Sequence, residues 1–484
     1  MSSLQFYNTR TRTTEKFIPQ HEGTVTLYTC GPTVYDYLTV GNWTAYIYWD
    51  VLVRLLEAND YTVHRVMNIT DVGHLVSDAD DGEDKLEKGA RREGKTAWDV
   101  AKFYGEDFLR GMQRLNLKKP EHITKATDYI PQQLELVRSL QQQGYTYQID
   151  DGIYFDTSKF PAYAEFAHLD VEAQKAGARV EFNQEKRNAS DFALWKFTPP
   201  GERRDMQWDT PVDLLVDAQA TRKGFPGWHL ECSAMAMDLL GRTLDIHTGG
   251  IDHIPVHHTN EIAQSEAATG ERFSNYWLHN NHLKVDGTKI SKSLGNGYTL
   301  DNLASKGYSP EALRMLVLQS SYQTEGNFTF ENLEAAKRRL HNWRRAAVLR
   351  HQIHETLKHT GDSMRIPSYA AAGALVETLN DNINTPEALA HIDKVLGDIL
   401  AASPTTIDRL ALIEFIEKAD NVLGFSIMET TADISDTQKQ TILERRRARD
   451  DKDWKRSDEL RDALLAEGVR VRDSAEASSW EYVE

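Results

Sequence analysis

Alternating apolar and polar positions near the start of the chain predict a strand, a turn, a helix and a second strand. Residues 24–29 (TVTLYT) alternate and are rich in β-branched side chains, which is typical of a strand. Residues 43–56 (WTAYIYWDVLVRLL) carry apolar side chains at helical spacing, and residues 62–70 (TVHRVMNIT) indicate a second, buried strand. Such a βαβ unit is right-handed by default and places its ligand site at the carboxyl end of the strand, where Cys30 stands.

After Pro120 the pattern changes, which indicates an insertion between two halves of the first domain. A helix is expected at residues 130–143, followed by short strands at 152–155 and 191–195. The segment 213–222 (DLLVDAQATR) lies between two more regular stretches, and the sequence assigns it no role.

From Ser309 onward the spacing is helical. Ser309 and Thr385 are each followed by Pro-Glu, the pattern of a helix N-cap with proline at the first helical position. A long helix is expected at residues 445–467, ended by Gly468. The predicted fold class is therefore α/β with a helical tail.

The net charge and the cysteine content narrow the class of protein. A formal net charge of −17 argues against a nucleic-acid coat or a polybasic membrane binder, although a local basic surface can still dock RNA. No apolar run approaches the roughly 20 residues of a membrane span, and the first residues lack the apolar core of a signal peptide. We therefore expect a cytoplasmic protein without membrane contact. In that reducing compartment Cys30 and Cys232, the only cysteines, are expected to be thiolate ligands and not a disulfide.

Four residues with soft or borderline ligand atoms suggest a zinc site. His257 and Glu261 stand four positions apart, so on a helix they share one face. Cys232, and Cys30 from the end of the first strand, would complete the four ligands that zinc sites need. Spacing alone also leaves open that both cysteines are small core residues, and it does not exclude two rival ligands, His229 and His258.

Three other segments have the composition of a phosphate or nucleotide site. Residues 39–42 (TVGN) open the first helix, where backbone N–H groups and the helix dipole can hold phosphate. Residues 247–250 (HTGG) end a strand with glycines that let a ligand ring approach the backbone. Residues 289–293 (KISKS) place two lysines on a loop that suits a polyphosphate. Each segment alone is equally typical of a helix cap or a solvated loop.

Taken together, these segments resemble a known enzyme class. CGPTVYDYLTVGN (30–42) resembles the HIGH-region signature of class I aminoacyl-tRNA synthetases, and KISKS resembles their KMSKS loop. Cys30 before GPTVYD, GWHLECSAMA (227–236) and HTGGIDHIPVHHTNEIAQSE (247–266) are similar to the cysteinyl-tRNA synthetase family in particular. The resemblance continues through NITDVGH (68–74), SDFALWK (190–196) and RRRARDDKDWKRSDELRDALLAEGV (445–469), and so covers essentially the whole chain.

The resemblance implies roles for individual residues. Those that match the family's zinc ligands are Cys30, Cys232, His257 and Glu261. Lys292 matches the lysine that binds ATP, and Lys289 is implied to assist it at the departing pyrophosphate. Residues matching the adenine-side motif are His247, Gly249 and Gly250. Residues implied to line the amino-acid pocket are Thr70, Trp228 and Asp252, with Cys30, Gly31 and Thr33. Thr39 and Asn42 replace the two histidines of the HIGH region and, with Gly41, are implied to contact ATP.

The implied fold is a Rossmann-type catalytic domain split by a connective insertion, then a stem-contact region with a helical bundle and a small anticodon-binding unit. The corresponding segments are 1–118, 119–222, 223–308, 309–430 and 435–484. The implied activity joins L-cysteine to tRNA(Cys), using ATP with Mg²⁺ and one zinc ion that selects the substrate thiolate. We expect a monomer.

Basic residues cluster at 337–350 and 445–456, which favours contact with RNA, while Trp343 and Trp454 within these stretches are expected to be core residues. Two other functions remain open. One is a cysteine ligase that acts on an amino sugar, which would lack the tail after Ser309. The other is a degenerate synthetase-like RNA-binding protein, favoured only by the altered HIGH region.

Overall fold

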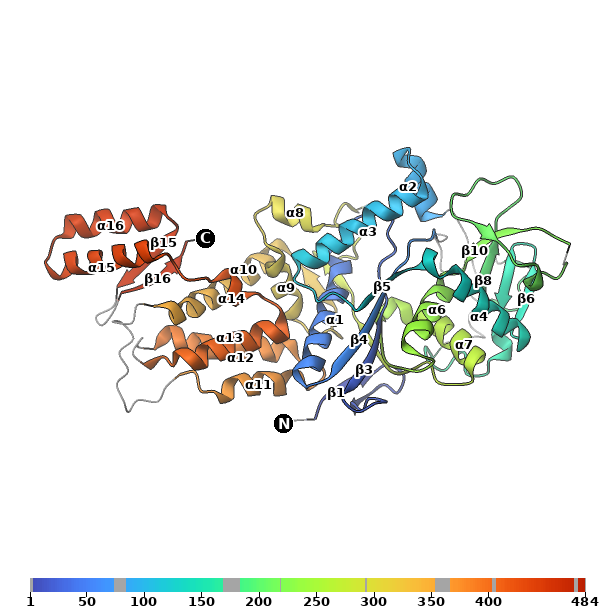
Figure 1. Cartoon of the computed structure of the whole chain (residues 1–484), viewed down its shortest axis with the longest axis horizontal. Helices are drawn as coiled ribbons and strands as arrows, with labels where there is room; N and C mark the ends of the chain where they lie inside the picture. Colours follow the sequence, from blue (N-terminus) through green and yellow to red (C-terminus); the bar gives the residue numbers. More distant parts are fainter. Residues whose placement is uncertain are drawn as a thin grey trace.

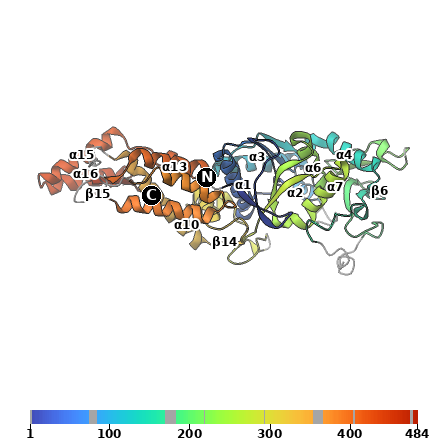
Figure 2. The ribbon, with the colours of Figure 1, turned by 90° about the horizontal axis from the view of Figure 1, so that it is seen from below.

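The computed structural model describes residues 3–73, 84–168, 183–217, 219–291, 294–352, 366–402, 406–473 and 478–483, without the side chains of Lys85 and Glu93. The molecule is elongated (Figure 1, Figure 2). The N-terminal α/β region adjoins an inserted β region on one side and a helical bundle on the other, and the C-terminal unit lies beyond the bundle. In this described part of the chain, no helix is both long and apolar enough to cross a membrane.

A five-stranded parallel sheet forms the centre of the N-terminal region. Its strands, in spatial order, are β12 (Ser274–Asn280), β11 (Leu244–Gly250), β3 (Thr24–Thr29), β4 (Thr62–Ile69) and β5 (His122–Lys125). Helix α1 (Val40–Ala58) lies on one side of the sheet in Figure 1, and α6 (Trp228–Leu240) and α7 (Thr259–Thr269) lie on the other. Cover on both faces accounts for the nearly continuous burial of β11 and β12.

The predicted βαβ unit is confirmed. β3 has the predicted bounds, and β4 ends one residue before the expected end. Helix α1 is longer than expected because it begins directly after Thr39, whose extended backbone (φ −88°, ψ 167°) ends the preceding loop. The apolar side chains of α1 are buried almost all round, since the helix packs on the sheet and also on α9 (Pro310–Leu318) and α13 (Arg409–Leu423).

Shorter elements complete this region. They are the hairpin β1 (Gln5–Asn8) and β2 (Thr13–Lys16), helices α2 (Lys85–Glu93) and α3 (Ala97–Arg114), and the parallel pair β13 (Leu283–Val285) and β14 (Gly326–Phe328).

The insertion contains a second, antiparallel sheet behind helix α4 (Ile130–Gln142). Its order is β6 (Thr146–Ile149), β7 (Gly152–Phe155), β8 (Phe192–Phe197), β10 (Lys223–Pro226) and β9 (Trp208–Asp209). Because β5 belongs to the parallel sheet and β10 to this one, strand pairing places both borders of the insertion a few residues later than 119–222. The division of the whole chain into five segments stays a prediction.

The segment 213–222 packs on the insertion. Leu214 and Leu215 are buried in the same apolar cluster as α4, and Arg138 of α4 donates to Asp213 over 2.6 Å. Val212 and Val216 on either side are exposed. The described part of this segment therefore covers the insertion's own core.

The tail begins with a helical bundle. Its helices are α8 (Leu300–Ser305), α9, α10 (Phe330–Ala347), α11 (Ala370–Leu379), α12 (Thr385–Ala401), α13 and α14 (Ile427–Thr430). Ser309 is the N-cap of α9, as predicted. For α12 the N-cap is Asn384, whose side chain accepts from the Glu387 N–H, so the expectation for Thr385 is wrong by one residue.

The C-terminal unit pairs two helices with a hairpin. They are α15 (Asp436–Asp450), α16 (Trp454–Ala466), β15 (Val469–Asp473) and β16 (Ser478–Tyr482). The single helix expected at 445–467 is wrong. The chain turns at Lys452, whose φ is +62°, and Asp453 then caps α16 by accepting from the Arg456 N–H. The polar run at 450–453 contains the break because Asp favours caps over helix interiors.

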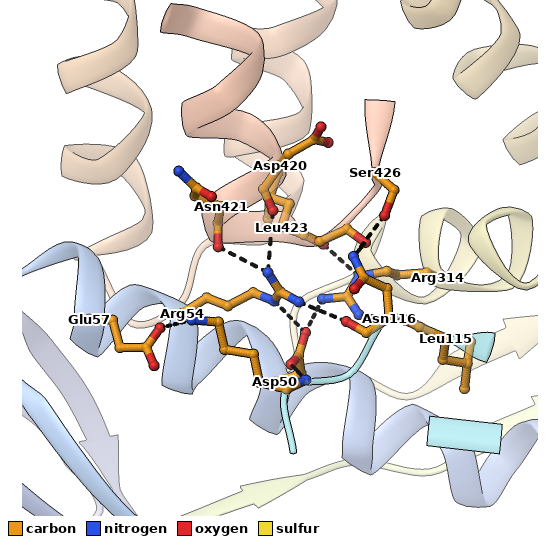
Figure 3. A network of polar contacts seen from close by, with 12 residues as sticks. Asp50, Arg54, Glu57, Leu115, Asn116, Arg314, Asp420, Asn421, Leu423 and Ser426 are labelled. Atoms are coloured by element: carbon orange, nitrogen blue, oxygen red, sulfur yellow. Dashed lines mark hydrogen bonds and ion pairs between the residues drawn. The ribbon is translucent and has the colours of Figure 1, made fainter. Parts of the chain in front are cut away.

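A buried ionic cluster joins the N-terminal α/β region to the helical bundle (Figure 3). The Asp50 carboxylate on α1 accepts from Arg54 Nε at 2.7 Å, from the Lys118 N–H at 2.6 Å and from Arg314 of α9. Arg314 also donates to the Leu115 and Leu423 carbonyls. We call Asp50, Arg54 and Arg314 the Asp50 joint. It connects α1, the 115–118 loop, α9 and the carboxyl end of α13, where cations are favourable.

Candidate metal centre and active site

Four elements bring the predicted metal ligands together. Cys30 follows β3, Cys232 lies in α6, and His257 and Glu261 lie on consecutive turns that end in α7. The ligand atoms of these four residues all lie within 4.8 Å of one another, and all four residues are buried. The structure thus gathers residues that are up to 231 positions apart in the chain into one potential metal site.

The two rival histidines are placed differently. A second group, consisting of Cys30, His247, His258 and Glu261, also has its ligand atoms within 4.8 Å, so His258 stays a possible ligand. His229 is in neither group. The Nδ1 atom of His229 lies 3.0 Å from the Nδ1 atom of His257, so His229 contacts the ring of a predicted ligand.

The environment of the Glu261 carboxylate suits a metal ligand. Its carboxylate is fully buried, with Oε1 3.4 Å from His257 Nε2 and Oε2 3.0 Å from His247 Nε2. These distances suit ion pairs, yet among the described residues neither oxygen has a partner in hydrogen-bond geometry. A buried carboxylate held this way is costly unless a cation neutralises it. Two sulfurs, one imidazole and one carboxylate are donors that zinc accepts.

The protons of the cluster are distributed unevenly. Burial and the neighbouring Cys232 thiol raise the pKa of Cys30 well above its ordinary value. Burial also opposes ionisation of Cys232, but hydrogen bonds with Cys30 and His257 lower its pKa. Burial opposes protonation of His257, yet Glu261 outweighs it and raises the pKa to about 10. Despite burial, His247 and His257 hold the pKa of Glu261 well below its usual range. The cluster therefore already stabilises two anionic ligands.

Aromatic and histidine rings pack around these ligands. Trp228 stacks on His257 with centroids 4.4 Å apart. On the other side Cys30 Sγ lies 3.4 Å from His258 Nε2, and His258 Nδ1 lies 2.7 Å from His279 Nε2. Gly249 is required here, because a Cβ at this position would lie 2.5 Å from the His258 ring. The rings fix the directions of the ligand side chains.

The residues assigned to the adenine side divide between two environments. His247 is fully buried, stacks on Trp277 at 4.4 Å and faces Glu261. It therefore lies inside the histidine cluster and not on an open surface. Gly250 lies at the cluster's edge, where a Cβ would meet the carboxylate of the exposed Asp252. A nucleotide role for His247, Gly249 and Gly250 stays a prediction.

Some of the residues predicted to line the amino-acid pocket lie in the loop after β3 and at the end of β4, and their role in a pocket stays a prediction. The Gly31 N–H donates to Asn68 Oδ1 at 2.8 Å, and Thr33 pairs with Thr70 in a short parallel bridge. Any side chain at Gly31 is excluded, because its Cβ would lie 1.6 Å from the Asn68 carbonyl oxygen. Trp228 is half-buried at the start of α6.

The phosphate segments also meet. The Asn42 carboxamide oxygen accepts from both the N–H and the hydroxyl of Thr39, each at 2.9 Å, and so caps α1. Ile290 of the lysine loop packs over Gly41, where a Cβ would lie 2.6 Å from the Ile290 side chain. Lys289 is exposed beside it. Lys292 lies outside the described residues.

Sequence reasoning missed two residues of this site. Asn68 and Glu231 are buried and connect Gly31 and Thr70 by hydrogen bonds. Both lie in segments that carry the family resemblance, NITDVGH and GWHLECSAMA, which is the signal that could have identified them.

Comparison with known proteins identifies the family. Residues 16–338 match the family model described as tRNA synthetases class I (C) catalytic domain. Residues 431–480 match the model described as cysteinyl-tRNA ligase anticodon binding domain. A cysteine–tRNA ligase of Burkholderia lata is 43% identical over 479 residues, covering 98% of this chain and 96% of the relative. One of Treponema denticola is 37% identical over 513 residues, covering 99% of each.

A solved structure supports the fold independently. The methionyl-tRNA synthetase of Mycobacterium tuberculosis, in complex with methionyl-adenylate, superposes with a TM-score of 0.61 at 15% sequence identity. The superposition covers 84% of this chain and 92% of that one, which establishes a shared class I synthetase fold. Together with the full-length relatives, it leads to one conclusion: the chain belongs to the cysteine–tRNA ligase family of class I aminoacyl-tRNA synthetases.

Proposed function

We propose that this chain activates L-cysteine with ATP and transfers the cysteinyl group to tRNA(Cys). The observation that carries the proposal is the buried set Cys30, Cys232, His257 and Glu261, whose ligand atoms lie within 4.8 Å of one another. In the reaction, the substrate carboxylate attacks the α-phosphate of ATP and pyrophosphate leaves. A hydroxyl of the terminal ribose of the tRNA then attacks the acyl carbon of the adenylate, and AMP leaves.

The metal cluster supports selection of a thiol substrate. These four residues would hold a zinc ion, which would bind a thiolate far better than a hydroxyl and so would select cysteine against serine. The protein's part is to hold the ligands still: Trp228 stacks on His257, and α7 fixes Glu261 one turn away. A zinc-depleted preparation that still rejects serine would contradict this role.

The start of α1 supports binding of ATP with Mg²⁺. The backbone N–H groups of the first turn and the helix dipole favour an anion there. Thr39, Gly41 and Asn42 form this turn, and Ile290 positions the lysine loop directly above it. Lys289 and Lys292 would supply the positive charge that stabilises the departing pyrophosphate.

The C-terminal unit supports a tRNA partner. Fewer of the basic residues at 337–350 and 445–456 are available to contact RNA than the sequence indicates. Arg350 and Arg445 are buried. Arg350 donates to the Thr431 hydroxyl and Arg445 to the Asp473 carboxylate, so these two arginines have a structural role. Trp343 is buried as expected, whereas Trp454 is 57% exposed, so the expectation of a core residue is wrong for Trp454. The Arg449 guanidinium lies 5.7 Å from the Trp454 ring centroid, and such a pair suits stacking on an unpaired base.

We further propose that the enzyme acts in the cytoplasm as a monomer, in keeping with its acidic charge and two unlinked thiols. Molar mass by light scattering tests the oligomeric state.

The decisive experiment is charging of an unmodified tRNA(Cys) transcript with labelled cysteine and ATP, with serine in a parallel reaction. Cysteine-specific charging supports the proposal. Formation of the adenylate without charging of tRNA would favour transfer to another acceptor, such as an amino sugar. Absence of both steps in the zinc-loaded protein would overturn the proposal.

A further inference from the structure

The Asn296 side chain contacts the beginning of the lysine loop, residues 288–291. Its Oδ1 accepts from the Ser291 N–H at 2.8 Å. Its Nδ2 donates to the Lys289 carbonyl at 3.2 Å and to Thr288 Oγ1 at 3.3 Å. Asn296 is half-buried. One carboxamide therefore holds the backbone on both sides of Ile290, which is the residue that packs over α1.

The direction of the Asn296 amide is fixed by its partners. Thr288 Oγ1 donates its hydrogen to the Val285 carbonyl at 2.9 Å. A hydroxyl has a single hydrogen, so this oxygen can only accept from Asn296, and the Lys289 carbonyl can also only accept. The NH₂ group of Asn296 must therefore face these two oxygens, and its own oxygen is left for the Ser291 N–H. A carboxylate at this position would bring a third acceptor against two others.

A tight turn leads into the lysine loop. The backbones of Val285 and Thr288 exchange hydrogen bonds at 2.9 and 3.0 Å. Between them, Gly287 has a φ of +73°, and its N–H donates to Asn327 Oδ1 at 2.8 Å. The chain thus enters the lysine loop from a fixed turn, and Asn296 holds the residues that come next.

The segment that Asn296 holds lies against the beginning of α1. Ile290 packs over Gly41, where a Cβ would lie 2.6 Å from the Ile290 side chain. On the other side of Asn296, the Tyr298 carbonyl accepts from the Val40 N–H at 2.8 Å. The backbone before and after Asn296 is therefore in contact with the first turn of α1.

Lys289 brings a positive charge to this place. Its side chain is exposed, and a lysine is a point charge on a flexible stem, so the backbone that carries it decides where the charge can reach. We propose that Asn296 is a positioning residue: it fixes the backbone at Lys289 and so places this lysine beside a polyphosphate bound at the first turn of α1. This inference rests on the proposed function, because it takes ATP as the bound anion.

The test measures cysteine-dependent ATP–pyrophosphate exchange. Asn296→Asp keeps the acceptor for Ser291 but loses both donors. We expect kcat to fall about tenfold to a hundredfold, the scale on which misplacing a catalytic group by about 1 Å acts. The KM for cysteine and the zinc content should stay at the wild-type values. Asn296→Ala, which removes the amide without adding a charge, should show a similar fall.

The matched control is Asn302→Asp in the neighbouring helix α8. Asn302 is exposed, and its side-chain oxygen accepts from the Thr299 N–H at 3.0 Å. An aspartate can keep that bond while adding the same negative charge near the loop. Asn302→Asp should therefore leave kcat unchanged.

Two further measurements separate positioning from damage to the fold. In a Lys289→Ala background, Asn296→Asp should cause less than about a twofold further loss, because the residue that it positions is already gone. Transfer of cysteine from the preformed, enzyme-bound adenylate to tRNA should proceed at the wild-type rate in Asn296→Asp, because pyrophosphate has already left.

An unchanged kcat in Asn296→Asp, full additivity with Lys289→Ala, or equal slowing of activation and transfer would overturn the inference. Wild-type protein that gives no cysteine-dependent exchange would instead refute the proposed function.

Discussion

The molecule buries two ionic clusters, and they differ in how their charges are satisfied. In the Asp50 joint, Asp50 and Arg314 are both fully buried, and Figure 3 shows the hydrogen bonds and ion pairs that they form with neighbouring residues. Asp50 accepts from two guanidinium groups and a backbone N–H, and Arg314 donates to two backbone carbonyls as well. In the metal cluster, Glu261 is equally buried, but its oxygens lack hydrogen-bond geometry among the described residues.

This difference separates a structural cluster from a binding site better than burial does. Burial disfavours the charged form of Asp50, yet Arg314 and Arg54 hold its pKa below the ordinary value. Both oxygens of Asp50 have hydrogen-bond partners there, so the joint needs no ligand. In the metal cluster two thiols, an imidazole and a carboxylate bring their ligand atoms within 4.8 Å of one another. Sulfur, imidazole and carboxylate groups that converge in this way are a suitable donor set for a zinc ion.

The largest effect is expected from breaking the Asp50 joint. Asp50→Asn leaves the buried guanidinium groups of Arg54 and Arg314 without their carboxylate partner, which should lower the free energy of unfolding by about 3–5 kcal/mol. Urea denaturation followed by tryptophan fluorescence measures the change. The control is Asp107→Asn, because the Asp107–Arg110 pair is largely exposed and should contribute less than about 1 kcal/mol. Equal effects of the two changes would show that the joint is not a stabilising contact.

The metal cluster should respond to a chelator, and the Asp50 joint should not. Removal of zinc is expected to lower the stability of the wild type by about 2.7 kcal/mol when free zinc had been at a hundred times its dissociation constant. Glu261→Gln should bind far less zinc and should show little further loss on chelation. The stability that Asp50→Asn loses on chelation should equal the stability that the wild type loses. Differential scanning fluorimetry with and without chelator measures the change in stability, and mass spectrometry measures the zinc content. If Glu261→Gln lost as much stability on chelation as the wild type, the assignment of Glu261 as a ligand would be contradicted.

A third buried carboxylate, Asp71, is expected to make the stability of the folded protein depend on pH. Burial raises its pKa to about 6, although the bonds from Thr127 oppose this. A folded-state pKa above the unfolded value of 3.8 means that the folded protein binds the extra proton. The corresponding stability is therefore fully present below about pH 4 and is lost as the pH rises through 6. Asp71→Asn should remove this dependence while keeping bonds to Thr127.

The measurement for Asp71 is the difference in melting temperature between wild type and Asp71→Asn from pH 4 to pH 8. The stability of the wild type should fall relative to that of the variant as the pH rises, and most of the change should occur between about pH 4 and pH 6. A difference that stays constant over this range would refute the assignment.

The sequence predicts the local part of this architecture and the residues of the metal cluster. Periodicity was sufficient for β3, β4 and α1, because each depends on neighbours in the chain. Cys30, Cys232, His257 and Glu261 were identified because the resemblance assigned them, and the fold gathers them. Their spacing alone left His258 open, and the second ligand group leaves it open still.

The Asp50 joint could not be predicted, for a physical reason. Asp50 and Arg314 are 264 positions apart, and neither has a pattern that distinguishes it from a surface charge on an amphipathic helix. The hydrogen bonds that Asn68 and Glu231 form with Thr70 likewise depend on the fold, which brings β4 and α6 into contact. The break at Lys452 and the exposure of Trp454 depend on how two short helices pair, which helical spacing does not encode.

The smallest effect should come from the exposed edge of the Asp50 joint. Lys118 Nζ pairs with Glu57, also drawn in Figure 3, and these side chains are 38% and 39% exposed. Water already solvates both groups, and ordering two long side chains offsets much of their attraction, so Glu57→Gln should change the free energy of unfolding by less than about 1 kcal/mol. The same denaturation experiment, repeated in 1 M salt, should reduce even that difference, because the Debye length falls to about 3 Å. The buried Asp50–Arg314 contact should keep its contribution in salt. If Glu57→Gln instead matched Asp50→Asn in magnitude, the stability of the joint would come from its surface, and burial with complete bonding would no longer distinguish it from the metal cluster.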